Sequence, residues 1–186
     1  MSKRLSLLLL VLGLAFNFSF GQNSNNVLKI MGIPISGTYN SFVSQLAERK
    51  FKETNIGWEG KFNGEDVVLQ IFTTPISRTV YQVAVMYKQG LKKYQAEKKC
   101  ETLRTIIARK YDTNFVYNEN SDYHLVEDCF ARIFNENQLI GIININAYAS
   151  FLSDYGVNII YMNLKGFQLN NKEENQQNEY IDNSDF

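Results

Sequence analysis

The sequence predicts an α+β fold in which helices pack on one face of an antiparallel sheet. Two amphipathic helical stripes, near residues 38–51 and 96–111, alternate with runs of strand-like residues. Short polar turns of the hairpin type separate those runs, so neighbouring strands are expected to be antiparallel. We therefore expect two helix-plus-antiparallel-meander units, at about 27–88 and 89–169, within one domain at 22–169.

The first helix is predicted to begin after Thr38, at the end of the stretch LKIMGIPISGTYNSF. Its apolar residues recur at helical spacing: Tyr39, Phe42, Val43, Leu46, Ala47 and Phe51. The Thr38 hydroxyl is placed to accept a backbone N–H of the first turn. Gly32 and Pro34 are expected to end a first strand, and Gly37 to turn the chain into the helix.

Three strands are predicted after this helix. Residues 57–62 and 66–73 are two strand-like runs joined by Asn63 and Gly64, a pair that tolerates the positive φ angles of a tight hairpin. The run VYQVAVMY at 80–87 then places Tyr81, Val83, Val85 and Tyr87 on one face. This run is the expected third strand.

The same order recurs in the second half of the chain. A helical stripe formed by Ala96, Cys100, Leu103, Ile107 and Tyr111 precedes CFARIFNENQLIGIININAY and GVNIIYMNL, which predict a hairpin and one further strand. A duplicated unit accounts for this order. A single sheet whose halves obey the same pattern rules accounts for it equally.

Residues 1–21 have the composition of a secretory signal peptide, with cleavage expected before Gln22. Lys3 and Arg4 precede an apolar run that ends near Phe16, and small residues stand before the cut. An uncleaved anchor is the alternative, but the apolar core is shorter than the roughly 20 residues that span a bilayer. We expect no transmembrane segment after signal removal, and a location in the periplasm or outside the cell.

The C-terminal residues 170–186 are predicted to form a disordered acidic tail. They hold one lysine against five carboxylates and almost no apolar side chains. The folded domain is therefore expected to end near Leu169.

The stretch from Gly32 to Gly37 has the G-x-x-x-x-G spacing of a phosphate-binding loop, but Thr38 and Tyr39 stand where lysine and a magnesium-binding hydroxyl are required. No cofactor is expected. The whole chain carries 19 basic and 19 acidic residues, which does not indicate a nucleic-acid partner.

His124 is the only histidine, and on a helix it would share a face with Glu127 and Asp128. A small secreted hydrolase with its site around His124 is therefore the alternative function. No nucleophile motif accompanies this histidine, so we expect no enzyme.

Cys100 and Cys129 are the only cysteines, and an even pair in an exported chain predicts a disulfide. Two buried thiols are the competing interpretation.

Aromatic and basic residues suggest a binding surface. Trp58, Tyr81 and Tyr87 offer large contact area with a polar group at one end. Lys92, Lys93 and Lys99 belong to residues 88–110, where eight basic residues face two glutamates. Core packing for the aromatic rings and a solvated helix face for the lysines are the competing interpretations.

The motif LKIMGIPISGTYNSFVSQLAERKF resembles the opening of a group of uncharacterised small exported proteins of Gram-negative bacteria, which share a G-I-P-x-x-G-T turn before the first helix. The expected architecture is similar to the β-lactamase-inhibitor-protein fold and to small outer-membrane-assembly lipoproteins. This resemblance implies a binding protein and no enzyme, although the chain lacks the lipidated cysteine of the lipoproteins. The expected function is thus a non-catalytic secreted or periplasmic binding module for a protein, peptide or glycan.

Overall fold

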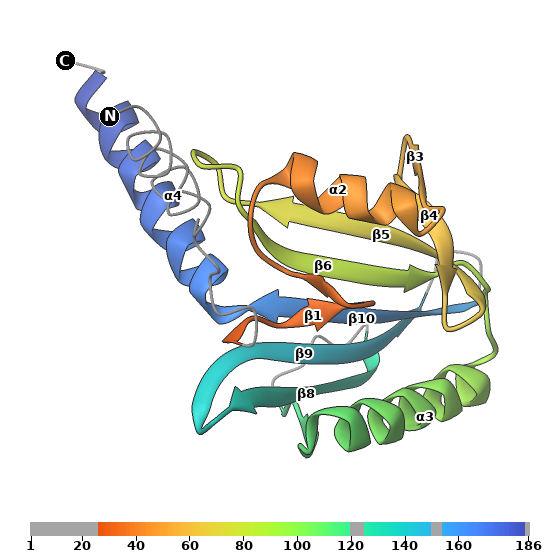
Figure 1. Cartoon of the computed structure of the whole chain (residues 1–186). Coiled ribbons are helices and arrows are strands. Elements are labelled where there is room, and N and C mark those ends of the chain that lie inside the picture. The colour runs from red at the N-terminus through yellow and green to blue at the C-terminus, as the bar shows by residue number, and fades with distance from the viewer. Residues whose placement is uncertain (1–25, 120–124, 150–153, 185–186) are drawn as a thin grey trace, which may run out of the picture.

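Two stretches of the chain each fold as one helix followed by four strands of an antiparallel meander (Figure 1). The computed structural model describes residues 26–119, 125–149 and 154–184, with side chains to 178. The first stretch holds α2 (Tyr39–Glu48), β3 (Lys52–Thr54), β4 (Gly57–Phe62), β5 (Glu65–Thr73) and β6 (Val80–Tyr87). The second holds α3 (Lys93–Tyr111), β7 (Val116–Tyr117), β8 (Leu125–Asn135), β9 (Gln138–Ala149) and β10 (Tyr155–Asn163). The predicted α+β class is confirmed.

The eight strands of these two stretches form one sheet in the order β3-β4-β5-β6-β10-β9-β8-β7. The last strands of the two stretches, β6 and β10, pair with each other at the centre, with Val85 opposite Ile159. The two outermost strands are the short β3 and β7. The topology of the two halves therefore repeats, while a duplication of the sequence stays a prediction.

The bounds of the longer strands agree closely with those predicted from residue alternation and turn residues in the sequence. Strand β4 has the predicted bounds, and β5 begins one residue earlier than expected. The β4–β5 turn has positive φ at Asn63 and Gly64, and the β8–β9 turn has positive φ at Glu136 and Asn137. Both pairs have the backbone of a two-residue hairpin turn, which matches the twist of the strands it joins. Strands β3 and β7 were not predicted because two or three residues carry no readable alternation.

The core lies between the sheet and the helices α2 and α3, which cover the same face (Figure 1). Helix α2 contributes Phe42 and Leu46, and α3 contributes Ala96, Cys100, Leu103 and Ile107, all at the predicted apolar positions. Every second residue of the central strands faces them, including Leu69, Val85, Ile145 and Ile159. Burial of this apolar face is the main force that holds the helices on the sheet.

The motif GIPISG contains the second strand of a hairpin that belongs to this core. Strands β1 (Lys29–Ile30) and β2 (Ile33–Pro34) pair with each other and are joined by Met31 and Gly32, both at positive φ. Ile30 and Ile33 are almost completely buried. The expected first strand is thus half of a small buried hairpin. As predicted, Gly37 has positive φ, and the Thr38 hydroxyl caps α2 by accepting the N–H of Ser41 at 3.4 Å.

Residues at the ends of both covering helices hold the hairpin in place. The Tyr111 hydroxyl, at the end of α3, donates to the Lys29 carbonyl at 3.0 Å. The Arg49 Nε, just after α2, donates to the Met31 carbonyl at 3.2 Å. The hairpin lies between α2 and α3 over the centre of the sheet (Figure 1) and so connects the two halves.

The structure differs from the prediction of a disordered acidic tail, because helix α4 runs from Leu164 to Ser184. The helix leaves the end of β10 and projects beyond the sheet (Figure 1). Its Phe167 ring packs against Tyr81 of β6, with 6.4 Å between ring centroids. The domain boundary expected near Leu169 therefore falls inside a helix.

Glu173 explains why this polar segment is attached to the fold. Its carboxylate is buried and accepts the backbone N–H groups of Ile76 and Ser77, in the β5–β6 turn, at 2.7 and 3.0 Å. Desolvation raises the pKa of Glu173, but hydrogen bonds from Ser77, Ile76 and Thr74 outweigh it and leave that pKa below its usual value. Composition alone does not show this contact, because its partners are almost a hundred residues apart.

The predicted signal peptide at 1–21 lies outside the described residues. Within the described ranges, no helix combines the length and the apolar character needed to cross a membrane.

Candidate functional site

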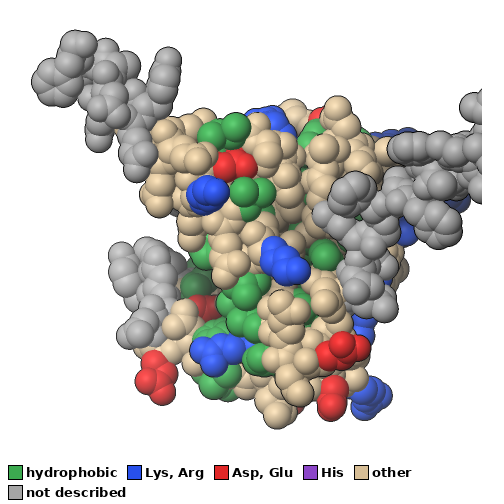
Figure 2. Space-filling model, turned by 60° about the vertical axis from the view of Figure 1, so that its left-hand side comes forward, with side chains coloured by type: hydrophobic (Ala, Val, Ile, Leu, Met, Phe, Trp, Pro, Cys, Tyr) green, Lys and Arg blue, Asp and Glu red, His purple; other side chains and the backbone are tan. Residues whose placement is uncertain are grey.

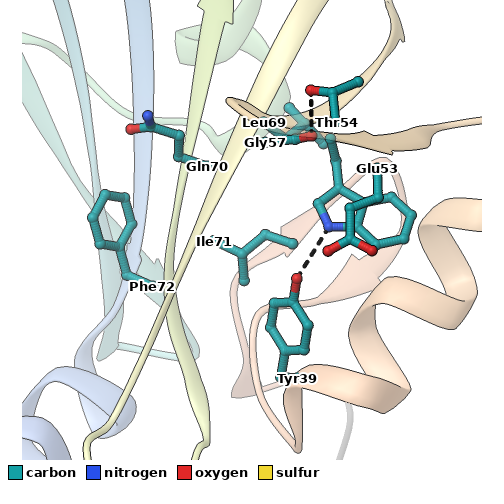
Figure 3. Close-up of a pocket in the computed structure, with 9 residues that line it drawn as sticks. Tyr39, Glu53, Thr54, Gly57, Leu69, Gln70, Ile71 and Phe72 are labelled. Carbon is teal, nitrogen blue, oxygen red and sulfur yellow. Dashed lines mark hydrogen bonds between the residues drawn. The ribbon is translucent and has the colours of Figure 1, made fainter.

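A pocket of about 330 Å³ lies where the beginning of α2 faces the β3–β4 end of the sheet (Figure 3). Aromatic rings and aliphatic side chains line it, together with a few polar groups that include a single carboxylate. The lining residues are Tyr39, Glu53, Thr54, Gly57, Trp58, Leu69, Gln70, Ile71 and Phe72. The pocket therefore has the mixture of apolar walls and a few polar groups that is typical of ligand sites.

Trp58 and Tyr39 are joined by a hydrogen bond at the centre of this pocket. The Trp58 indole Nε1 donates to the Tyr39 hydroxyl oxygen at 3.2 Å, and both residues are partly buried. This bond fixes the orientation of the two rings and leaves the Tyr39 proton available for an acceptor on a ligand. The two rings come from β4 and α2, so the tertiary fold creates the pair.

The β3–β4 turn forms the rim of the pocket. The Thr54 hydroxyl donates to the Gly57 carbonyl at 2.9 Å, which closes the turn (Figure 3). Ile56, between them, is 53% exposed. Figure 3 also shows Glu53 and Ile71 directed toward the space beside Tyr39, while Gln70 and Phe72 lie on the other side of β5.

Of the residues predicted to form a binding surface, Trp58 lines this pocket, whereas Tyr81 and Tyr87 have structural contacts. Tyr81 packs against Phe167 of α4. Tyr87 is 5% exposed, with the Lys99 Nζ 3.6 Å from its ring centroid. Burial, with a smaller contribution from Glu65, raises the pKa of the Tyr87 hydroxyl well above its usual value. The core interpretation therefore fits Tyr87 best.

None of the three predicted lysines lines this pocket. Lys99 forms an ion pair with Glu65 in addition to its contact with the Tyr87 ring. Lys93 is 3.9 Å from Glu97 one helical turn later, and Lys92 stands at the N-cap of α3. Two of the three predicted lysines thus have a carboxylate partner.

The molecular surface shows no large area of one sign on the face drawn in Figure 2. There, basic and acidic side chains are interspersed among hydrophobic ones. A second hollow, of about 500 Å³, is lined by several lysines. Two of these are already paired, Lys61 with Asp66 at 3.0 Å and Lys88 with Glu59 at 2.9 Å. The Trp58 pocket is therefore the site with the more distinctive chemistry.

The predicted disulfide is wrong, because Cys100 and Cys129 are both free thiols in the core. Burial is the main cause that raises their pKa values, to about 12 for Cys100 and about 11 for Cys129. The Cys129 thiol donates to the Ile145 carbonyl at 3.6 Å. Thiols held in the protonated form react slowly in disulfide exchange, which requires the thiolate.

The two carboxylates of the alternative hydrolase site, Glu127 and Asp128, are on a strand and not on a helix. His124 lies outside the described residues, and β8 contains Glu127 and Asp128, whose side chains lie on opposite faces of the sheet. Glu127 accepts from Arg104 of α3 at 3.1 Å. Asp128, on the face away from the helices, accepts from Asn118 and Asn144 at 2.8 and 2.6 Å. The prediction that the two carboxylates share a face is therefore wrong.

Sequence reasoning identified Trp58 and missed its partners Tyr39, Glu53 and Ile71. Tyr39 was assigned only to the apolar stripe of the first helix, and no local pattern distinguishes the other two. Their common position depends on how α2 crosses the sheet. No pattern in the sequence indicates that these side chains lie together around Trp58.

In the part of the chain that the structure describes, no three side chains of the His, Cys, Asp and Glu types gather as a metal site would require. Comparisons of the chain with protein-family models, with curated proteins and with solved structures find no match.

Proposed function

We propose that this chain is an exported, non-catalytic binding module that takes a protein, peptide or glycan ligand at the Trp58 pocket. The observation that supports this function is the pocket itself, where two aromatic rings bonded to each other line a cavity of about 330 Å³. Aromatic rings with a polar edge provide large contact area at low conformational cost, which is why binding sites are enriched in them.

The groups around the pocket favour binding over catalysis. Its titratable side chains are Glu53 and Tyr39, which supply neither a nucleophile with a paired base nor two carboxylates facing one another. The thiols of Cys100 and Cys129 are buried and protonated, because their pKa values lie far above the pKa of a catalytic cysteine.

Purified protein beginning at Gln22 provides the test, by binding to arrays of peptides and of glycans. Trp58→Ala should lose the signals that the wild type gives, because it removes the largest wall of the pocket. Tyr94→Ala is the matched control, since Tyr94 is an aromatic residue that is 62% exposed on α3 and outside the pocket. Circular dichroism confirms that each variant is folded.

Signals that survive in Trp58→Ala would contradict the proposal, as would arrays on which the wild type binds nothing. Turnover of ester or glycoside substrates that disappears in His124→Ala would favour the hydrolase instead.

A further inference from the structure

Strand β5 has a free edge beside the Trp58 pocket. Its pairing with β4 runs from Glu65 opposite Phe62 to Leu69 opposite Trp58 and ends there. Strand β5 continues to Thr73, whereas β4 begins only at Gly57, where the turn from β3 ends. Among the described strands, residues 70–73 are thus paired only with β6, on one side.

The backbone direction identifies which residue faces this free edge. The Asp66 carbonyl accepts the Lys88 N–H at the end of β6, so the backbone groups of Asp66 point toward β6. Successive residues of a strand direct their N–H and C=O groups to alternate sides. The groups of Leu69 therefore point toward β4, which agrees with the Leu69 oxygen lying 2.5 Å from where a Cβ would stand at Gly57. By the same alternation, those of Ile71 point past the end of β4.

Among the described residues, none hydrogen-bonds to the Ile71 N–H and C=O on that side. An unpaired donor and acceptor on a strand edge match the backbone of another extended chain. A sugar ring does not present a donor and an acceptor at the regular spacing of a peptide backbone. The backbone geometry thus favours a peptide over the other ligand classes.

The side chains around Ile71 indicate which type of peptide side chain fits the pocket. A residue directly opposite Ile71 would place its side chain on the same face of the sheet as Ile71. That face contains the Tyr39 and Trp58 rings, so an aliphatic side chain there would fill the pocket (Figure 3). Ile56, at the rim, adds further exposed apolar surface.

Glu53 adds a charge preference. It lies opposite Trp58 across β3 and β4 and is directed toward the pocket (Figure 3). None of the ion pairs among the described residues includes Glu53. A lysine or arginine on the same face of the peptide would supply the missing cation.

We propose that β5 accepts an extended peptide as an additional strand at Ile71, with an aliphatic side chain in the Trp58 pocket and a basic side chain at Glu53. This inference rests on the proposed function and names the class of its ligand. The peptide backbone provides two hydrogen bonds to Ile71, and the alternate side chains provide selectivity.

The test uses a capped hexapeptide, threonine-valine-threonine-lysine-threonine-valine, in which valine and lysine share one face. Trp58 is the only tryptophan of the chain, so its fluorescence reports binding at the pocket directly. The residues whose side chains enter the pocket are also those whose N–H groups face β5. N-methylation at the valine and lysine residues should therefore weaken binding by about tenfold, because the residue opposite Ile71 loses the one peptide N–H that donates to the Ile71 carbonyl.

N-methylation at the threonine residues is the matched control, because those N–H groups face away from β5, and it should leave binding unchanged. Glu53→Gln should reduce the preference for lysine over norleucine in the peptide. Glu53 is exposed, so this variant is expected to fold.

Equal binding by both methylated series would overturn strand addition and leave binding at Trp58 intact. A glycan that binds at Trp58 while no hexapeptide does would also overturn it and would retain the proposed function. Dimers in sedimentation experiments that the hexapeptide cannot dissociate would assign the free edge to a second copy of this chain instead.

Discussion

Replacing Ile33 by alanine tests the inference that the GIPISG hairpin is part of the core. Ile33 is fully buried, at 0% exposure, in a hairpin of only two paired residues on each side. So short a hairpin is not stable by itself, and it holds its place through burial between α2, α3 and the sheet. Truncation of this side chain should therefore destabilise the whole domain.

The expected loss follows from the buried atoms. Isoleucine to alanine removes three buried carbon atoms, at roughly 0.8 kcal/mol each, and the unfilled cavity adds to that transfer term. We expect a decrease of about 3–4 kcal/mol in the free energy of unfolding. For a chain of this length, such a decrease lowers Tm by roughly 10 °C.

Urea unfolding followed by Trp58 fluorescence measures this loss. The control is Ile56→Ala, which makes the same chemical change at a side chain that is 53% exposed and should cost less than about 0.5 kcal/mol. A loss below about 1 kcal/mol for Ile33→Ala, or one equal to the control, would refute a core role for the hairpin.

Three further predictions follow from single contacts. Glu173→Gln should release α4 from the β5–β6 turn and increase hydrogen exchange in that helix. In the wild type the same release should begin as pH falls below about 4.3 and be complete below the lowered pKa of Glu173, because a depressed carboxyl pKa stabilises only while the group is ionised. Cys100 and Cys129 should resist iodoacetamide near neutral pH in the folded protein, and both should react after unfolding. Gly57→Ala should lower the free energy of unfolding by more than about 1 kcal/mol, because φ is 137° there and the new Cβ would lie 2.5 Å from the Leu69 oxygen.

Different results would count against each of these contacts. Equal exchange in α4 for Glu173→Gln and for the neighbouring control Glu174→Gln would mean that the turn does not hold the helix. Rapid labelling of either cysteine in the native protein would contradict its burial. Wild-type stability of Gly57→Ala would show that the β3–β4 turn accommodates a side chain.

The regular elements could be predicted because their signals are local. The stripe from Phe42 to Leu46 and the alternation from Val83 to Tyr87 depend only on residues within one turn or one strand. The Asn63-Gly64 turn is equally local, since a two-residue hairpin loop needs positive φ at both of its positions. Short strands such as β7 were missed because they contain too few residues to show a period.

The candidate site could be predicted only in part. Trp58 was recognised by residue type, whereas its hydrogen bond to Tyr39 joins residues 19 positions apart. The expected cluster of His124, Glu127 and Asp128 assumed a helix, and the strand geometry of β8 sends the two carboxylates to opposite faces. A strand was the better assignment there, since β8 extends the alternating run that follows.

By itself, the sequence determined the α+β class, the two covering helices and the longer strands of both meanders, because periodicity and turn residues act over short distances. Only the tertiary structure decided that GIPISG completes a buried hairpin, that Glu173 attaches a polar helix to the β5–β6 turn, and that β5 extends past β4 beside Trp58. Each of these depends on contacts between residues far apart in the chain. No local pattern encodes such contacts, since their free energy comes from burial and pairing that exist only once the sheet has formed.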